Sequence, residues 1–112
     1  MTEIEKKALS YLGLAMRAGR VVVGVPMICE ALKKGKREKT PLIVLEAADT
    51  SPNTHKRITD RTVFYRTPHV RLTVQAEALA AAVGKAPALV GAVGVTEPQL
   101  SKRIAELFEI NL

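Results

Sequence analysis

The chain has 112 residues, of which 47% are hydrophobic, and its formal net charge is +6. This length and composition predict a single domain, residues 1–112. A helix that spans a membrane needs roughly 18 consecutive apolar residues, and because every apolar run in the chain is much shorter, a membrane segment is excluded. With no visible signal peptide and one cysteine, Cys29, which excludes an intramolecular disulfide framework, we expect a cytoplasmic protein with an anionic partner.

The hydrophobic periodicity predicts nine elements that alternate between helix and strand. In chain order they are a helix over 2–18, a strand over 21–23, a helix over 26–35, a strand over 42–45, a helix over 52–65, a strand over 70–74, a helix over 75–83, a strand over 88–95, and a helix from 96 to about 107. Such alternation predicts an α/β fold in which a sheet lies between layers of helices.

Several helices carry signals at their ends. Thr2-x-x-Glu5 and Thr96-x-x-Gln99 are capping boxes, in which the first side chain and the fourth satisfy each other's free backbone amides. Ser51 followed by Pro52 is a further helix start. These signals predict where the first, third and last helices begin.

The strands differ in their expected burial. Leu42–Leu45 is continuously apolar and predicts a strand buried on both faces, whereas Val70–Val74 alternates and predicts a half-buried one. Within Ala88–Val95, Gly91 and Gly94 predict either a bulge or a close approach of another segment to the backbone.

A candidate anion site lies where the first strand meets the second helix. Val21–Val23 leads to Gly24, Pro26 suits a first helical position, and Gly35 suits the left-handed residue that ends a helix. The free N–H groups and the dipole at such a helix N-terminus favour anions. The alternative is an ordinary α/β turn that binds nothing.

The positive charge is unevenly distributed. Residues 1–72 carry 14 of the 17 Lys and Arg, including a basic connector over residues 33–39. This favours a nucleic acid as the anionic partner, although a basic surface without a specific ligand is the alternative. With no Trp, two Tyr and two Phe, the chain lacks the aromatic residues of a sheet that stacks exposed bases.

The chain shows no constellation typical of an enzyme. Gly84-Lys85 lacks the remaining features of a phosphate-binding loop, and no Cys/His set has the spacing of a metal site. His55 and His69 have no evident nucleophile partner, so each is expected to be a surface or structural residue, and Cys29 a small packing residue. We therefore expect no catalysis, no metal and no cofactor.

Four segments, in this order and spacing, resemble the L-seven-Ae / L-thirty-e ribosomal protein superfamily, whose members bind kink-turn RNA, and in particular its small bacterial ribosomal-protein-like paralogues. The segments are residues 12–20 (Leu-Gly-Leu-Ala-Met-Arg-Ala-Gly-Arg), Gly24 with its helix to Gly35, residues 45–54 (Leu-Glu-Ala-Ala-Asp-Thr-Ser-Pro-Asn-Thr), and residues 79–84 (Leu-Ala-Ala-Ala-Val-Gly). The resemblance covers nearly the whole chain and implies a three-layer α/β/α sandwich around a mixed sheet of about four strands.

The resemblance also implies where RNA binds: at the N-terminus of the second helix and at the loop before the last strand. Mapped onto this chain, the first site is Gly24 to Ile28 with Glu30, and the second is Gly84 to Leu89. With the basic residues that end and follow the same helix, the candidate RNA-binding residues are Gly24, Val25, Pro26, Met27, Glu30, Lys33, Lys34, Lys36, Arg37, Gly84, Lys85, Ala86, Pro87 and Ala88.

The chain departs from the family pattern at the positions that carry recognition. Typical members place polar side chains where this chain has Pro26 and Met27, and a basic one where it has Glu30, whose charge would repel phosphate. The backbone part of the site, with Gly24 at the helix N-terminus, is retained.

Three functions remain open from the sequence. The first is a non-catalytic RNA-binding protein, a monomer that binds structured RNA (ribosomal or kink-turn-like) and is associated with the ribosome and translation. The second is a protein-interaction module, with Val25, Pro26, Met27, Pro87 and Leu89 as an apolar rim; alternatively these residues pack beneath the loops. The third is a substrate-binding domain of the kind appended to RNA ribose methyltransferases, here without a catalytic domain.

Overall fold

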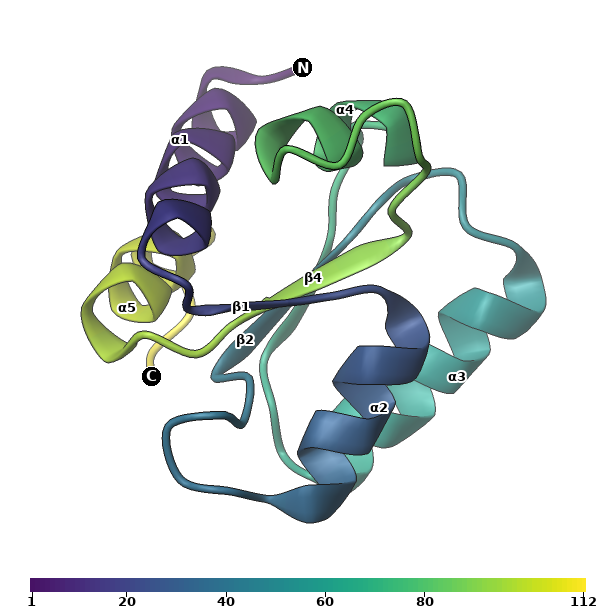
Figure 1. The fold of residues 1–112 in the computed structure, drawn as a ribbon, viewed down its shortest axis with the longest axis vertical. Coiled ribbons are helices and arrows are strands. Elements are labelled where there is room, and N and C mark those ends of the chain that lie inside the picture. The colour runs from purple at the N-terminus through teal and green to yellow at the C-terminus, as the bar shows by residue number, and fades with distance from the viewer.

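The computed structural model describes residues 1–112 and contains five helices that alternate with four strands (Figure 1). In chain order they are α1 (Glu3–Arg17), β1 (Val21–Val23), α2 (Val25–Lys34), β2 (Ile43–Glu46), α3 (Pro52–Phe64), β3 (His69–Arg71), α4 (Ala76–Ala82), β4 (Ala92–Val95) and α5 (Pro98–Leu107). The predicted alternation is confirmed. No helix combines the length and the hydropathy needed to cross a membrane.

The four strands form one mixed sheet in the order β1-β4-β2-β3. β4 pairs antiparallel with β1 and with β2, while β2 and β3 run parallel. In this register Glu46 lies opposite Ala92, and Val23 opposite Val93. The ends of β1 and β2 and the start of β4 therefore lie at the same end of the sheet, which we call the loop end.

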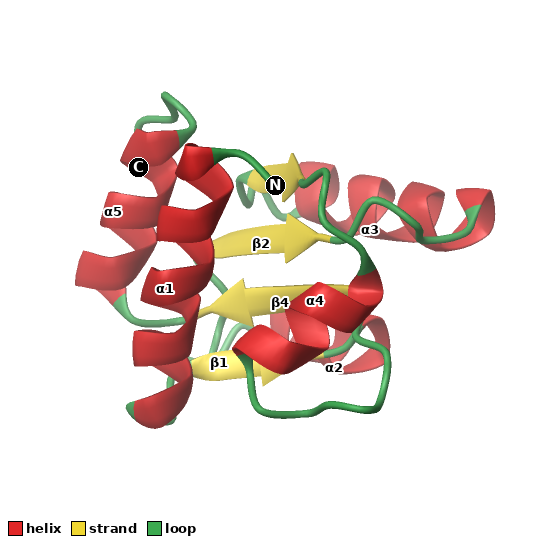
Figure 2. Ribbon diagram, turned by 90° about the horizontal axis from the view of Figure 1, so that it is seen from above, coloured by secondary structure: helices red, strands yellow, loops and turns green.

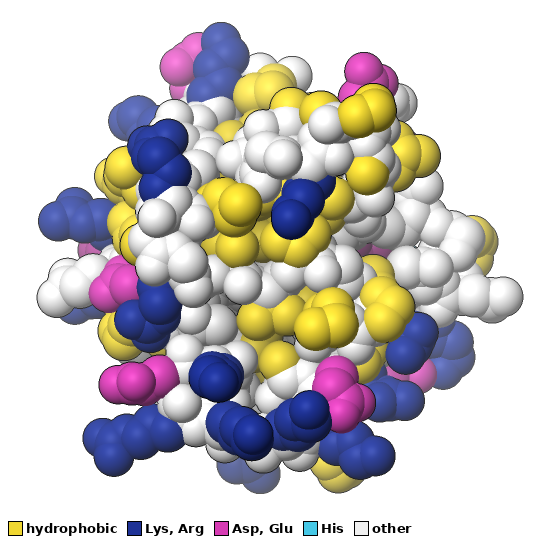
Figure 3. Space-filling model, in the orientation of Figure 1, with side chains coloured by type: hydrophobic (Ala, Val, Ile, Leu, Met, Phe, Trp, Pro, Cys, Tyr) yellow, Lys and Arg dark blue, Asp and Glu magenta, His cyan; other side chains and the backbone are white.

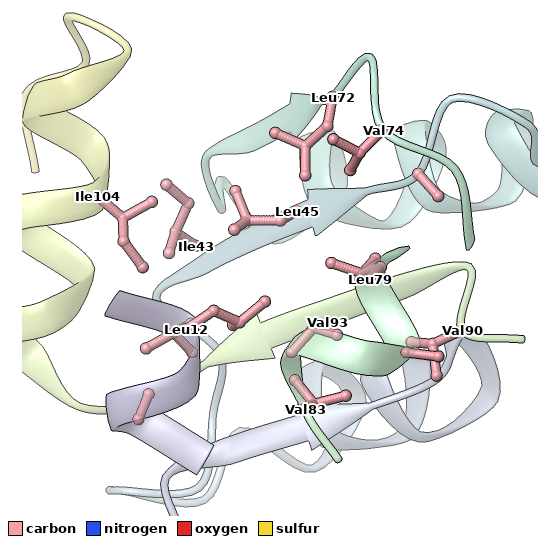
Figure 4. Packing of buried hydrophobic residues seen from close by; sticks show 14 of the residues in the cluster. Leu12, Ile43, Leu45, Leu72, Val74, Leu79, Val83, Val90, Val93 and Ile104 are labelled. Atoms are coloured by element: carbon pink, nitrogen blue, oxygen red, sulfur yellow. The ribbon is translucent and has the colours of Figure 1, made fainter. Parts of the chain in front are cut away.

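Helices cover both faces of the sheet (Figure 2). On one face α1, α4 and α5 pack over a cluster of 16 buried hydrophobic residues, which includes Leu12, Leu45, Leu79, Val93 and Ile104 (Figure 4). On the other face, α2 and α3 bury a smaller cluster made of Val25, Ile28, Cys29, Leu32, Val44, Ile58 and Ala92. The three-layer sandwich is thus confirmed, and Cys29 is a buried packing residue as expected.

The capping box of α1 also makes a long-range contact. The Thr2 hydroxyl accepts from the Glu5 amide at 3.0 Å, and the Thr2 amide donates to Glu5 Oε1 at 3.1 Å, as predicted. The same carboxylate accepts from the backbone N–H and the hydroxyl of Thr73, beyond β3. Burial opposes ionisation of Glu5, but these hydrogen bonds outweigh it and hold its pKa below the usual value. Glu5 therefore joins the start of the chain to the segment after β3.

Two predicted strands are too long. The strand predicted over 70–74 is β3, His69–Arg71, because β2 ends at Glu46 and the Thr73 amide donates to Glu5 instead of to a neighbouring strand. The strand predicted over 88–95 is β4, Ala92–Val95, since residues 84–89 are exposed and no partner strand extends beyond Ala92.

Gly94 does not form a bulge. It pairs in register with Val22 and Val44, and a Cβ added to it would lie 2.8 Å from the Pro41 ring. Of the two predicted reasons for this glycine, the close approach is therefore correct.

The predicted N-cap of the last helix is wrong by one residue. Glu97 caps α5, with its carboxylate accepting from the Leu100 amide at 2.6 Å. Thr96 instead continues the pairing of β4, because its amide donates to the Arg20 carbonyl and its hydroxyl accepts from Arg20 Nε. The second capping box is absent for this reason.

Candidate nucleic-acid interface

The N-terminus of α2 presents two backbone donors at the loop end of the sheet. Gly24 is the N-cap, with φ 95°, and its own amide donates to the Ala92 carbonyl at 2.9 Å. Pro26 has no N–H, and the Ile28 amide donates to the Gly24 carbonyl. The amides of Val25 and Met27 are therefore the donors that the first turn of α2 leaves for a ligand.

The loop between α4 and β4 is the second predicted site. Residues 84–89 are all exposed, and the loop turns back on itself where the Ala88 amide donates to the Lys85 carbonyl at 2.9 Å. The loop begins at Gly84, with φ 68°, and contains a cis peptide between Ala86 and Pro87.

The segment that joins this loop to β4 lies beside the start of α2 and beside a third segment. The Ala47 amide donates to the Gly91 carbonyl at 2.8 Å, and a Cβ placed on Gly91 would lie 3.7 Å from Val25 and 3.4 Å from Thr50. The turn over residues 47–51 thus contacts Gly91, which follows the second predicted site and lies beside Val25 of the first. We call the three together the loop-end surface: the first turn of α2, the turn 47–51 and the loop 84–91.

Sequence reasoning named the turn 47–51 as part of the family resemblance but not as part of the site. The sequence feature that could have identified this turn is the apolar strand before it, β2, because the segments at the ends of nearby strands converge at one end of a sheet. That inference required the strand order, in which β4 lies between β1 and β2.

The turn 47–51 is held from below by a buried carboxylate. Glu46, the last residue of β2, is fully buried and accepts hydrogen bonds from Thr50, His55 and His69. Arg71 donates to the carbonyls of Ala48 and Thr50, at 3.1 and 3.3 Å. Burial opposes ionisation of Glu46, yet the hydrogen bonds from Thr50 and the two histidines hold its pKa below the usual value.

The structure separates the predicted basic residues from the loop-end surface. Lys33 and Lys34 lie in the last turn of α2, and Lys36 and Arg37 follow it. A helix of 10 residues is about 15 Å long, so these cations lie at the opposite end of α2 from the free amides.

Two of these residues, Lys34 and Lys36, border a groove between α2 and the edge strand β1, together with Lys39. The groove has a volume of about 390 Å³, and its lining includes three lysines, two glutamates and Met27: Lys34, Lys36, Lys39, Glu30 and Glu38. Glu30, which the sequence suggested would repel phosphate, forms an exposed ion pair with Lys34 at 3.5 Å. We call this feature the basic groove.

The apolar residues of the loop-end surface divide between packing and exposure. Val25 is buried in the smaller hydrophobic cluster, beneath α2 and α3, whereas the side chain of Met27 is 60% exposed and that of Leu89 is 71% exposed. Figure 3 shows hydrophobic side chains in the middle of the face that carries β1, with Lys and Arg along the lower rim where α2 ends. Exposed apolar side chains and free amides thus lie at the start of α2, and the basic residues lie at its other end.

Comparison with known proteins adds independent information. The sequence profile of the ribosomal protein L7Ae/L30e/S12e/Gadd45 family matches residues 6–105. The chain is 33% identical to the RNA-binding protein YlxQ of Enterococcus faecium over 104 residues, which cover 93% of each chain. It is 30% identical to the RNA-binding protein YlxQ of Bacillus subtilis over 98 residues, covering 88% of this chain and 91% of that one.

Two solved structures are similar in fold. A protein of unknown function from Bacillus halodurans C superposes with a TM-score of 0.79 at 27% identity, over 92% of this chain and 97% of that chain. The 15.5kD RNA-binding protein of Giardia lamblia superposes with the same TM-score, 0.79, at 16% identity, over 96% and 86%. The second likeness is one of fold alone.

Proposed function

The chain belongs to the ribosomal protein L7Ae/L30e/S12e/Gadd45 family, and from this premise we propose that it is a non-catalytic RNA-binding domain of the bacterial cytoplasm, spanning residues 1–112 and acting as a monomer. Its partner is structured RNA, of ribosomal or kink-turn-like type, and its place is with the ribosome and translation. Relatives of nearly equal length that are named RNA-binding proteins support this proposal.

The observation that carries the proposal is the convergence at the loop end of the sheet. The free amides of Val25 and Met27 lie at the same end of the sheet as the exposed residues 84–89 and the turn 47–51, and Gly91 contacts both Val25 and Thr50. Backbone amides at a helix N-terminus bind phosphates or base edges whatever the side chains are. RNA recognition through the backbone is thus compatible with Pro26 and Met27 at positions where the family places polar side chains.

The basic groove supplies the electrostatic part of the proposal. A backbone running from the loop-end surface along α2 would pass Lys34 and Lys36, which line one groove together with Met27 from the first turn of the helix. Lysine contacts to phosphate release counterions and give affinity without sequence preference. We therefore assign specificity to the loop-end surface and general affinity to the basic groove.

The test is a titration of the purified protein against a kink-turn RNA and a hairpin of equal length, at several salt concentrations. A preference for the kink-turn would assign recognition to the backbone amides and loop 84–91. Equal, strongly salt-dependent binding would indicate a general binder of structured RNA. The absence of binding to both RNAs at low salt would contradict the proposal.

Variants separate the two surfaces. Replacing Lys34 and Lys36 by Ala should reduce the slope of log affinity against log salt by roughly 1.5, at about 0.7–0.9 per phosphate contact. Lys102→Ala, on the exposed side of α5, is the matched control and should leave the slope unchanged. Equal effects of both changes would show that the groove has no special role.

A second candidate function, protein interaction, is favoured by one observation. Met27 and Leu89, one in each predicted site, are largely exposed rather than packed beneath the loops. Exposed apolar side chains that gather on one face mark interaction sites. If the chain binds neither RNA at low salt, this second function becomes the preferred one.

A further inference from the structure

A cluster of ionisable side chains, centred on a buried glutamate, lies directly beneath the turn 47–51. Glu46 ends β2, His55 lies in the first turns of α3, and His69 begins β3. His55 Nδ1 lies 2.8 Å from Glu46 Oε1, and His69 Nε2 lies 2.7 Å from the same oxygen. The parallel pairing of β2 and β3 places His69 opposite Val44, two residues before the glutamate.

The three side chains offer the ligand atoms of a zinc site. Two imidazole nitrogens and one carboxylate oxygen, with water as the fourth ligand, form an established open coordination set for Zn²⁺. Here the three candidate atoms lie within 4.8 Å of one another. Zinc–ligand distances of about 2.0–2.2 Å place tetrahedral ligands roughly 3.3 Å apart, so small side-chain rotations suffice to admit the ion.

The second carboxylate oxygen is already held by other groups. Glu46 Oε2 accepts from the Thr50 hydroxyl, lies 3.6 Å from Arg71 Nε, and also lies 3.0 Å from His55 Nδ1. Arg71 is itself fixed by the carbonyls of Ala48 and Thr50. Thr50 and Arg71 thus fix the carboxylate, as outer groups do in metal sites, and Oε1 is the oxygen that both imidazoles approach most closely.

Exposure decreases inward across the cluster. The side chain of His55 is 37% exposed, that of His69 is 14% exposed and that of Glu46 is fully buried. An ion and its water ligand can therefore enter beside His55, while the carboxylate is shielded from competing water. An acidic cluster on an open surface would lack this arrangement.

We propose that Glu46, His55 and His69 form a Zn²⁺ site in which Oε1, Nδ1 and Nε2 are the respective ligands and water completes the coordination. In the metal-free protein each of these two nitrogens faces the carboxylate as an N–H donor. On zinc binding the proton of His55 moves to Nε2 and that of His69 to Nδ1, which frees a lone pair on each ligand nitrogen. The zinc proposal does not depend on RNA binding by the loop-end surface above it, and it is tested on the protein alone.

The experiment titrates chelator-treated, dialysed protein with Zn²⁺ alone, in competition with a chromophoric chelator. We expect one ion per chain. His55→Gln and His69→Gln should each weaken binding at least 100-fold, because a glutamine amide keeps the hydrogen bond to Glu46 but is a poor zinc ligand. Thr50→Val, which removes only the outer hydroxyl, should weaken it about tenfold.

Cys29→Ala is the matched control, since a thiol is the other strong zinc ligand of this chain and lies buried in the α2 packing. It should bind zinc with unchanged affinity. Circular dichroism of each variant verifies the fold, and His55, being the most exposed ligand, carries the comparison if His69→Gln unfolds.

A spectroscopic measurement tests the wild-type chain without any substitution. Long-range ¹H–¹⁵N spectra of the histidine rings should show zinc on Nδ1 of His55 and on Nε2 of His69. Failure of the folded wild type to take up zinc, equal affinity in His55→Gln, or zinc on other ring nitrogens would each overturn the proposal.

Discussion

Replacing Gly94 by Ala tests the packing that positions the candidate interface. Gly94 lies in β4 between β1 and β2, and its Cβ position is 2.8 Å from both Cβ and Cγ of Pro41. Carbon atoms in favourable contact are about 3.5–4.0 Å apart, so the new methyl group is roughly 0.7 Å or more too close. The Pro41 ring cannot rotate away, and the adjacent Leu42 amide is fixed to the Val95 carbonyl at 2.8 Å.

The magnitude follows from two opposing effects. Overpacking of this kind costs about 1–3 kcal/mol, while exchanging glycine for alanine within a strand recovers roughly 0.5–1 kcal/mol of backbone entropy. We expect a net loss of about 1–2 kcal/mol in the free energy of unfolding. At roughly 4 °C per kcal/mol for a domain of this size, Tm should fall by about 4–8 °C.

The assay is urea and thermal denaturation followed by circular dichroism. Gly13→Ala in α1 is the matched control, because a Cβ there would approach nothing nearer than the Ala82 carbonyl oxygen at 3.6 Å. It should stabilise the protein by about 0.5–1 kcal/mol. A Gly94→Ala variant as stable as the wild type, or more stable, would refute the argument from close approach.

Three further outcomes are expected. The folded-state pKa of Glu5 lies below the unfolded value near 4.5, so the stabilisation of the fold by the Glu5 carboxylate is complete above that pH and is lost as the pH falls through the folded pKa. The urea midpoint of Glu5→Gln should therefore drop less on acidification than that of the wild type. An equal drop in both proteins would contradict this. Ser51→Ala removes the N-cap hydrogen bond to the Thr54 amide and should cost about 1 kcal/mol, against little change for the exposed Ser10→Ala. Met27→Glu should weaken RNA binding and Met27→Lys strengthen it, each by on the order of 1 kcal/mol, or about fivefold; equal affinities in a filter-binding assay would place RNA away from the start of α2.

The candidate site could be predicted in part. The resemblance to the family identifies the N-terminus of α2 and the loop 84–89, and the structure places both at the loop end of the sheet, where Gly91 lies beside Val25. The turn 47–51 was not assigned to the site, and the lysines at the end of α2 were grouped with amides about 15 Å away. Helix length was available from the sequence, but the relation of the helix to the loops was not. RNA binding by these residues stays a prediction.

By itself the sequence determined the elements and most of their ends. Capping, glycine stops and apolar periodicity act over three or four residues, so α1, β1 and α2 were placed to within one residue from local chemistry alone. Strand ends were less accurate, because a strand continues only where a neighbour pairs with it.

Only the tertiary structure decided what depends on strand order. It shortened β4 because β2 offers no partner beyond Glu46, and it moved the cap of α5 because Arg20 engages Thr96. It also brought His55 and His69 together at Glu46, although the sequence showed no evident nucleophile partner for either histidine. The physical reason is the same in each case: these contacts join residues far apart in the chain, and no local pattern records which strands will be neighbours.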